Sequence, residues 1–364
     1  MLYEKILKPV LFQMDPEKAH HLTIGGMGFA QKVPGVLPLF RSLYSSPSAP
    51  ELQQTLWNIT FANPIGLAAG LDKNGEAAGA FSHMGFGFIE VGTVTPRPQP
   101  GNDKPRLFRL PEDEALINRM GFNNHGAEVM RKNLEALRKR PIPIAVNIGK
   151  NKTTPNDEAV QDYRSCMRIL YDVGDYFVVN ISSPNTPNLR NLQHGDDLSA
   201  LLAGVIEERD QQAAKRGSAA KPVLVKIAPD MTKEELAGCV QIIKSSGISG
   251  IIATNTTITR NNLRGRHQEE TGGLSGKPLN RLSVNVVRQV YQLTEGQIPI
   301  VASGGVFTGD DAYEMIRAGA SLVEIYTGMI YRGPGVNRSN NKRLLALLRR
   351  DGYKHISEAV GADA

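Results

Sequence analysis

The 364-residue sequence predicts an α/β protein, a (β/α)8 TIM barrel with a small helical extension at its N-terminus. Two observations predict this fold. Apolar segments rich in β-branched residues alternate with helical stretches eight times, and no Gly-x-Gly-x-x-Gly turn of an open doubly wound sheet is present. Their near-continuous apolar character is typical of strands buried in a parallel sheet. The expected strands are 64–68, 86–91, 142–148, 176–181, 223–227, 250–254, 298–302 and 322–326.

Each expected strand is followed by a stretch with helical periodicity. These helices are expected at 76–84, 127–139, 156–173, 196–216, 233–246, 282–294, 309–318 and 338–350. Residues 56–61 are expected to form a short hairpin before the first strand, and the Ser- and Pro-rich residues 45–50 a linker. We therefore divide the chain into a helical extension, residues 1–44, a barrel, residues 45–352, and a tail without clear periodicity, residues 353–364.

The extension is expected to be helical and amphipathic. Residues 1–14 form one apolar face, made by Leu2, Ile6, Leu7, Val10, Leu11 and Met14. Asp15 and Pro16 provide an N-cap and a first-turn proline for a second helix that runs to about Phe29. A third apolar cluster lies at 36–40. Two interpretations stay open here, a helical pair packed on the barrel and an element that lies in a membrane interface.

The composition excludes several classes of protein. Hydrophobic residues make up 41% and charged residues 21%, as in ordinary globular proteins, and no apolar run is long enough to cross a bilayer. The net charge of +6 is scattered, which argues against nucleic acid and fits an anionic ligand or lipid surface. Cys166 and Cys239 are expected to be reduced packing residues, and the N-terminus lacks a secretory signal, which predicts a cytoplasmic location.

The carboxyl ends of the expected strands carry amides, hydroxyls and two lysines. Barrel enzymes collect their active residues at these ends. No His, Cys or carboxylate group there has metal-ligand spacing, so no metal site is expected. Asparagine offers both a donor and an acceptor, so convergent amides suit a flat ring such as a pyrimidine. The polar residues include Lys73, Thr93, Asn147, Asn180, Lys226, Thr254, Asn255 and Thr256.

Two further features of the strand ends predict ligand contacts. Pro184 and Pro187 prevent a helix directly after 176–181, so this loop is expected to project Ser183 and Asn185 from the strand end. The glycine pair 304–305 and Thr327 with its following glycine occupy positions where barrels commonly bind phosphate, which indicates a phosphorylated ring cofactor. Lys226 would stabilise negative charge on an isoalloxazine ring; alternatively it forms a buried ion pair with Glu90 or Glu324.

Several long motifs resemble those of the dihydroorotate dehydrogenases. They are GLAAGLDK at 66–73, GTVTPRPQPGN at 92–102, NRMGFNN at 118–124, NISSPNTP at 180–187, ATNTT at 253–257 and TGGLSG at 271–276. The resemblance covers nearly the whole chain and is strongest to class 2, the quinone-reducing, membrane-associated type. Class 1 relatives carry a cysteine at the base position and lack the extension, whereas this chain has Ser183 and residues 1–44.

The resemblance implies FMN as cofactor and oxidation of dihydroorotate to orotate in de novo pyrimidine synthesis. Ser183 would be the catalytic base. FMN would be held by Ala69, Gly70, Leu71, Asp72, Lys73, Thr93, Asn147, Asn180, Lys226, Thr254, Gly276, Gly305, Tyr326 and Thr327. Substrate would contact Lys73, Asn118, Arg119, Met120, Gly121, Phe122, Asn180, Asn185, Asn255 and Thr256.

The resemblance also implies a second half-reaction, in which ubiquinone or menaquinone accepts the electrons. His20, Arg109 and Tyr326 would line the quinone site, with His21 as the alternative to His20. The protein would be a monomer bound peripherally to the cytoplasmic face of the cell membrane. Two alternatives remain, a class 1-like enzyme that uses fumarate or NAD, and an aldolase-type barrel without flavin in which Lys73 or Lys226 forms a Schiff base.

Overall fold

The computed structural model describes residues 3–46, 48–137 and 139–364. Leu2 and Arg138, which the sequence analysis assigned to helices, and Pro47 of the expected linker lie outside these residues. Within the described residues, no helix is both long and apolar enough to span a bilayer.

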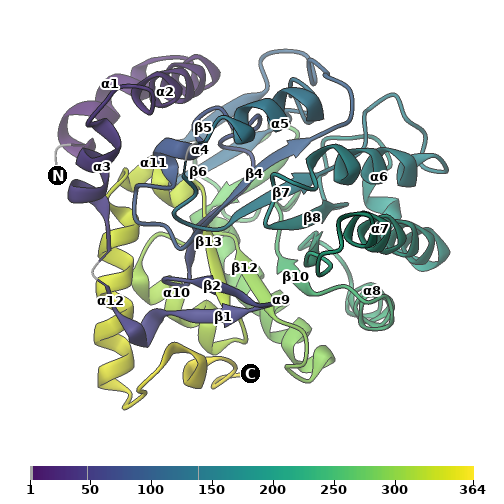
Figure 1. The fold of residues 1–364 in the computed structure, drawn as a ribbon. Helices are drawn as coiled ribbons and strands as arrows, with labels where there is room; N and C mark the ends of the chain where they lie inside the picture. The colour runs from purple at the N-terminus through teal and green to yellow at the C-terminus, as the bar shows by residue number, and fades with distance from the viewer. Residues whose placement is uncertain (1–2, 47, 138) are drawn as a thin grey trace.

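The centre of the molecule is a closed barrel of eight parallel strands, which confirms the predicted fold (Figure 1). Hydrogen bonds join neighbours in chain order, and β13 pairs with β3 to close the ring. Because all strands run in parallel, their carboxyl ends meet at one mouth. The strands are β3 (Ile65–Leu67), β4 (Phe88–Val94), β7 (Ile144–Ile148), β8 (Tyr176–Asn180), β9 (Val223–Ile227), β10 (Gly250–Ala253), β12 (Ile300–Ser303) and β13 (Leu322–Ile325).

The opposite end of the barrel is sealed by side chains. The predicted hairpin, β1 (Gln54–Leu56) and β2 (Ile59–Phe61), covers this end. Phe61 is fully buried and meets Phe88 edge to face with 5.6 Å between ring centroids. Aromatic pairs of this geometry add to the stabilisation from apolar burial. The barrel interior is therefore a packed core that leaves only the mouth for a ligand.

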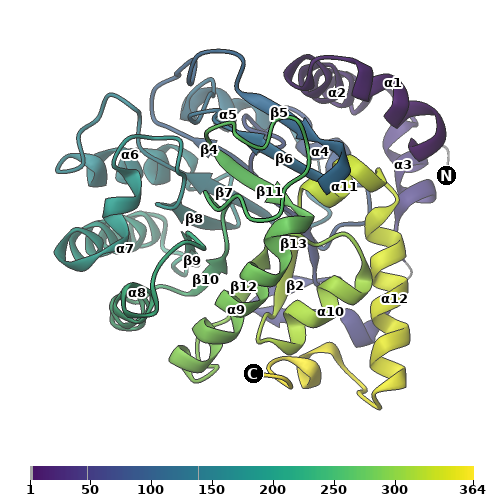
Figure 2. The same ribbon diagram turned by 180° about the vertical axis from the view of Figure 1, so that it is seen from behind.

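Helices surround the barrel, as Figures 1 and 2 show. Their buried faces carry the 3.6-residue apolar periodicity that predicted them. The first is shorter than the expected 76–84, because the Asp72 carboxylate binds the backbone N–H groups of Glu76 and Ala77 in a turn before it. The helices are α4 (Ala78–Phe81), α5 (Ala127–Glu135), α6 (Ala159–Leu170), α7 (Gly195–Arg216), α8 (Lys233–Ser245), α9 (Asn280–Thr294), α10 (Gly309–Arg317), α11 (Thr327–Arg332) and α12 (Val336–Arg350).

A three-stranded antiparallel sheet beside the barrel was not predicted. It consists of β5 (Leu107–Leu110), β6 (Ala115–Asn118) and β11 (Gly273–Gly276), in the order β11-β6-β5 (Figure 2). In the β6–β11 register, Asn118 lies opposite Gly273, although the two are far apart in sequence. The sheet thus joins the loop after β4 to the loop after β10.

The N-terminal extension folds as a π-helical turn, Tyr3–Leu7, followed by α1 (Lys8–Gln13), α2 (Pro16–Ala30) and α3 (Val36–Tyr44). Residues 1–14 were expected to form one helix; the described part changes helix type after Leu7. The predicted N-cap is confirmed, since the Asp15 carboxylate accepts the Lys18 N–H at 2.9 Å. Large apolar side chains of the extension face solvent, namely Ile6, Leu7, Val10, Leu22, Phe29, Val33, Leu39 and Leu43.

The C-terminal residues pack on the barrel's outer helices. Ile356 and Ala359 of a short 3-10 turn, Ile356–Ala359, are buried. Asp363 forms an ion pair with Arg317 of α10 at 2.5 Å. Residues 353–364, in which the sequence showed no periodicity, are therefore attached to α10.

Candidate active site

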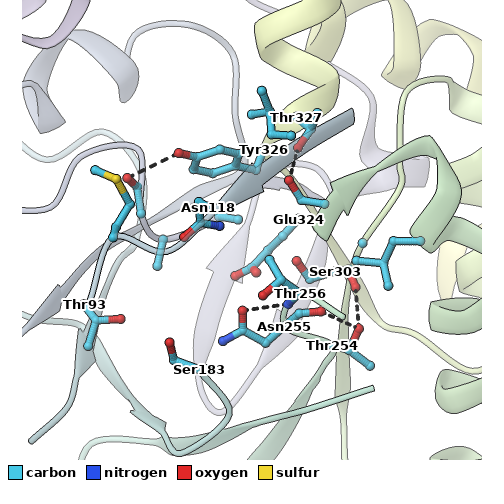
Figure 3. A pocket seen from close by; sticks show the side chains of 18 of the residues that line it. Thr93, Asn118, Ser183, Thr254, Asn255, Thr256, Ser303, Glu324, Tyr326 and Thr327 are labelled. Atoms are coloured by element: carbon cyan, nitrogen blue, oxygen red, sulfur yellow. Dashed lines mark hydrogen bonds between the residues drawn. The ribbon is translucent and has the colours of Figure 1, made fainter. Parts of the chain in front are cut away.

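A cavity with an empty volume of about 1200 Å³, including its opening to solvent, lies at the barrel mouth (Figure 3). A cavity that is partly open to solvent and lined by convergent polar groups suits a cofactor with a small substrate. Its walls come from the ends of the barrel strands and from the sheet β5-β6-β11. The sequence-predicted residues that line it are His20, Ala69, Gly70, Lys73, Thr93, Asn118, Met120, Gly121, Phe122, Asn180, Ser183, Asn185, Lys226, Thr254, Asn255, Thr256, Gly276, Gly305, Tyr326 and Thr327.

Five of the predicted site residues lie outside this lining, and their proposed ligand contacts stay predictions. The Asp72 carboxylate is occupied by the two N–H groups that it caps, and Leu71 precedes it. The Asn147 side chain donates to Glu90 at 2.5 Å. Arg119 pairs with Glu270 at 2.7 Å, and Arg109 donates to the Met14 carbonyl at 2.7 Å. In this structure Arg109 therefore fastens the extension to β5.

Amides and hydroxyls after β8 and β10 hold one another in place. Asn180 donates from Nδ2 to Thr93 Oγ1 at 2.8 Å, and its Oδ1 accepts from Ser182 Oγ at 3.0 Å. Ser182 Oγ in turn accepts from Asn255 Nδ2 at 2.9 Å. Hydrogen bonds of this kind fix which edge of each amide faces the cavity. The expected set of oriented donors and acceptors is thus present at the mouth.

Ser183 lies in the loop after β8, as its two prolines predicted. Its Oγ accepts the Asn185 N–H at 3.3 Å, and the Asn185 side chain donates to Asn118 Oδ1 at 3.2 Å. Ser183 is buried and faces the cavity. The Thr186 hydroxyl is also buried, and it has no hydrogen-bond partner among the described residues.

Arg190 connects the loop after β8 to the segments after β9 and β10 through hydrogen bonds and an ion pair. Its Nε donates to the Ser182 carbonyl and its Nη2 to the Thr256 carbonyl, each at 3.0 Å. Its Nη1 pairs with Asp230, from the segment after β9, at 2.8 Å. The planar guanidinium fork suits such a three-way contact. Arg190 therefore ties together the chain segments that follow β8, β9 and β10.

Lys73 is a half-buried lysine between the cavity and α2. Its Nζ donates to the Gly70 carbonyl at 2.6 Å and lies 3.5 Å from His20 Nε2. Burial lowers the pKa of Lys73 to about 8, with the positive charge of Arg106 adding to the effect and Glu17 opposing it. Burial, together with the charge of Lys73, lowers the pKa of His20 to about 2, so this imidazole is neutral. An anion in the cavity would give the Lys73 ammonium a partner.

Lys226 forms the buried ion pair that was one of its two interpretations, and its contact with an isoalloxazine ring stays a prediction. Its ammonium lies 2.7 Å from Glu90 and 3.1 Å from Glu324, and it also lines the cavity. Burial opposes its charge, but the attraction of the two carboxyls outweighs burial and raises the pKa of Lys226. Lys226 is therefore a permanent cation at the cavity wall.

The opposite wall is built from glycines at the ends of β12 and β13. A Cβ on Gly305 would lie 2.5 Å from the Asn280 backbone nitrogen, and its φ of +74° also favours glycine. Thr327 Oγ1 donates to Ser275 Oγ at 2.9 Å beside this wall. A glycine wall that exposes backbone, a cation and oriented amides together fit a flat ring bearing a phosphate. The donor set suits a flavin.

Comparisons with known proteins decide the family. The family model described as dihydroorotate dehydrogenase matches residues 51–348. The chain belongs to the dihydroorotate dehydrogenase family. A protein of Deinococcus deserti named dihydroorotate dehydrogenase (quinone) is 53% identical over 363 residues, which cover 100% of both chains. The protein of that name from Deinococcus radiodurans is 51% identical over 99% of this chain and 100% of its own.

Solved structures of the family share the fold. A crystal structure of DHODH from Eimeria tenella in complex with ferulenol superposes with a TM-score of 0.87, at 42% identity over 96% of each chain. The ligand-free structure from the same organism gives 0.87 at 44% identity, covering 96% of this chain and 99% of that one. Nearly the whole chain of this family member thus has a counterpart of known structure.

Sequence reasoning missed part of the dihydroorotate dehydrogenase cavity wall. Leu107 and Leu116 belong to the unpredicted sheet, and no local pattern indicated that they would reach the mouth. Ser303 and Glu324 lie in the barrel strands β12 and β13; Glu324 was expected only as an ion-pair partner of Lys226, and neither was expected in the cavity wall. A charged residue inside an otherwise apolar strand was the signal that could have singled out Glu324. The other additional lining residues are Ala68, Ser275, Leu279 and Val306.

Proposed function

We propose that this protein oxidises dihydroorotate to orotate with FMN as hydride acceptor and a respiratory quinone as final electron acceptor, in pyrimidine synthesis. Membership of the family supports the dehydrogenase activity and implies a flavin cofactor, and the full-length relatives named for quinone support the acceptor. The observation that carries the assignment to the barrel mouth is the convergence of Ser183, Lys73 and the amides on one cavity.

The residues of the cavity have separate tasks in the first half-reaction. The Lys73 ammonium binds the substrate carboxylate, and Asn118, Asn185 and Asn255 hydrogen-bond the ring edges. FMN, when bound, supplies the hydride acceptor. Ser183 takes the proton from the carbon next to the ring carbonyl. A serine hydroxyl is a weak base, so its own proton must be passed on, and the buried Thr186 hydroxyl offers a relay.

The second half-reaction uses the N-terminal extension. The exposed apolar side chains of the extension suit the interface of a membrane. We propose that this extension holds the protein peripherally on the cytoplasmic face of the cell membrane and guides a ubiquinone or menaquinone to a site near His20, Arg109 and Tyr326. We propose a monomer as the working unit.

The other candidate activities have less support. A Schiff base at Lys226 would require a free amine, whereas this ammonium is held between two carboxyls. A class 1-like acceptor, fumarate or NAD, has less support, because the full-length Deinococcus relatives are named for quinone.

Anaerobic mixing tests the proposal. The purified protein should be yellow, should bleach when dihydroorotate is added, and should regain its colour with quinone but not with fumarate or NAD. A colourless protein, or a flavin that dihydroorotate does not bleach, would overturn the proposal. Flotation with anionic liposomes, which should depend on residues 1–44, tests the membrane contact separately.

A further inference from the structure

Three buried titratable side chains lie together inside the barrel mouth, and their charges would not sum to zero if all three were ionised. Glu90 of β4, Lys226 of β9 and Glu324 of β13 are each at most 5% exposed. Lys226 contributes one positive charge, and two ionised carboxylates would leave one negative charge without compensation. An isolated buried charge is strongly unfavourable, so one carboxyl must hold a proton.

The hydrogen-bond partners decide which carboxyl is ionised. Glu90 accepts three donors, since Oε1 accepts from Asn147 Nδ2 at 2.5 Å and Oε2 accepts from Lys226 Nζ at 2.7 Å and from the Ala69 N–H at 3.1 Å. Among the residues that the structure describes, Glu324 accepts from Lys226 alone, at 3.1 Å. Donors stabilise a carboxylate, so the charge resides on Glu90 and the proton on Glu324. Burial and the repulsion from Glu90 raise the pKa of Glu324.

Among Glu90, Lys226 and Glu324, Glu324 has a side-chain oxygen that accepts no hydrogen bond from the described residues. Its Oε1 is buried and has no hydrogen-bond partner within the described part of the chain. The residue lines the cavity, and Figure 3 shows its side chain between Tyr326 and Ser303, directed toward the middle of the pocket. A buried polar atom without a partner in the protein indicates a partner supplied by a ligand or by water.

We propose that Glu324 is a residue of the flavin site that remains protonated in the working enzyme and offers its unpartnered carboxyl oxygen to the cofactor. This inference rests on the proposed function for the identity of the cofactor. The protonation state of Glu324 determines the net charge that the Glu90, Lys226 and Glu324 side chains place beside the flavin. With Glu324 neutral, the cluster has no net charge, and Lys226 can offset the negative charge that hydride transfer brings to the site. An ionised Glu324 would oppose that charge.

The titratable neighbours of Glu324 leave no other source of compensation. Lys226 faces it from β9, Glu90 from β4, and the Tyr176 phenol from β8. The Tyr176 pKa is itself raised well above its ordinary value by burial and by the two carboxyls, so this phenol is neutral. The proton on Glu324 is thus the only means within this cluster of reaching neutrality.

Infrared difference spectroscopy of holo-protein tests the protonation state. E324Q has the same shape and is neutral, so the wild-type minus E324Q spectrum at pH 7 should contain the carbonyl band of a protonated carboxyl, with its deuterium shift. Bands of an ionised carboxylate in its place would overturn the proposal.

The midpoint potential of the bound flavin provides a second test of the protonation state. E324Q should change the equilibrium constant for flavin reduction less than tenfold at pH 7, which is a shift of less than about 30 mV for a two-electron couple. A larger rise would mean that a negative charge had been removed.

The rate of flavin release from holo-protein tests the contact. E324L, which cannot hydrogen-bond, should release flavin at least about tenfold faster than wild type, the order expected when a buried hydrogen bond is lost, whereas E324Q should release it at the wild-type rate. Equal rates in all three proteins would overturn the contact, and E324Q decides the protonation state should E324L fail to fold. If the wild-type flavin does not bleach with dihydroorotate, the proposed function fails. The infrared spectrum, the midpoint potential and the flavin release rate still test the role of Glu324, because none of them depends on dihydroorotate.

Discussion

The buried ion pair between Glu17 of α2 and Arg106 predicts how tightly the extension is held on the barrel. Arg106 Nη2 lies 2.7 Å from Glu17 Oε1, and the two side chains are 7% and 6% exposed. Arg106 Nη1 also donates to the carbonyls of Pro100 and Asn102, at 2.7 and 2.6 Å. In the E17Q variant Arg106 therefore stays on the barrel, and its charge loses the partner that α2 provided.

Removing one partner of a buried pair costs about 3–5 kcal/mol. At 1.4 kcal/mol per factor of ten, the docking equilibrium of α2 should weaken by about 10²- to 10³-fold or more. Because α2 belongs to the quinone side, E17Q should slow flavin reoxidation by a long-tail quinone and leave the rate of flavin reduction at saturating dihydroorotate close to that of wild type, although loss of the Glu17 charge next to Lys73 should raise the dihydroorotate concentration needed for saturation. Stopped-flow absorbance measures the two half-reactions separately, and urea denaturation measures the loss of stability.

The K104A variant is the matched control. Lys104 Nζ lies 3.5 Å from the same Glu17 carboxylate, but its side chain is 66% exposed. Exposed ion pairs contribute about 0–1 kcal/mol, so K104A should behave like wild type in both half-reactions. Wild-type quinone reoxidation in E17Q, or equal destabilisation by E17Q and K104A, would refute the reasoning.

Three further predictions follow from the cavity and the extension. Burial lowers the Lys73 pKa to about 8, so the ammonium is present below that pH and lost above it. The KM for dihydroorotate should therefore rise with pH above about 8, and K73M should have a high KM at all pH values. A pH-independent wild-type KM would exclude the role of this lysine. Deletion of residues 1–44 should spare flavin reduction but abolish turnover with long-tail quinones and liposome flotation, and unchanged turnover would contradict it. R190K keeps the charge but loses the guanidinium fork that joins the Ser182 and Thr256 carbonyls, so it should slow flavin reduction without releasing flavin, whereas an unchanged rate would remove Arg190 from loop positioning.

Local pattern predicted most of the barrel. Each expected strand overlaps an observed one, and 223–227 matches β9 residue for residue, because buried parallel strands have a distinctive apolar composition. The sheet β5-β6-β11 was missed, since its strands have four residues each and β6 pairs with β11 across more than 150 residues of chain. Such pairings depend on tertiary contacts that no short window contains.

Site residues at the carboxyl ends of the barrel strands could be predicted from the sequence. The hydrogen bonds and protonation states that depend on partners distant in sequence could not. Asn180, Asn255 and Lys226 were expected at the mouth and line it. Asp72 and Asn147 were also expected to bind cofactor, and that stays a prediction; their side-chain hydrogen bonds to protein groups were not predicted, because they depend on neighbours brought together by folding. The protonation of Glu324 likewise follows from Glu90 and Lys226, which are distant in sequence.

The rate of flavin reduction in the S183A variant tests the central claim most directly, namely that the loop after β8 deprotonates a substrate held at the barrel mouth. Anaerobic stopped-flow mixing with dihydroorotate should show bleaching slowed by at least about 10²-fold, the low end for loss of a general base, with flavin fully bound. Reoxidation by quinone should stay at the wild-type rate and serves as the internal control. Bleaching of S183A at the wild-type rate would contradict the account.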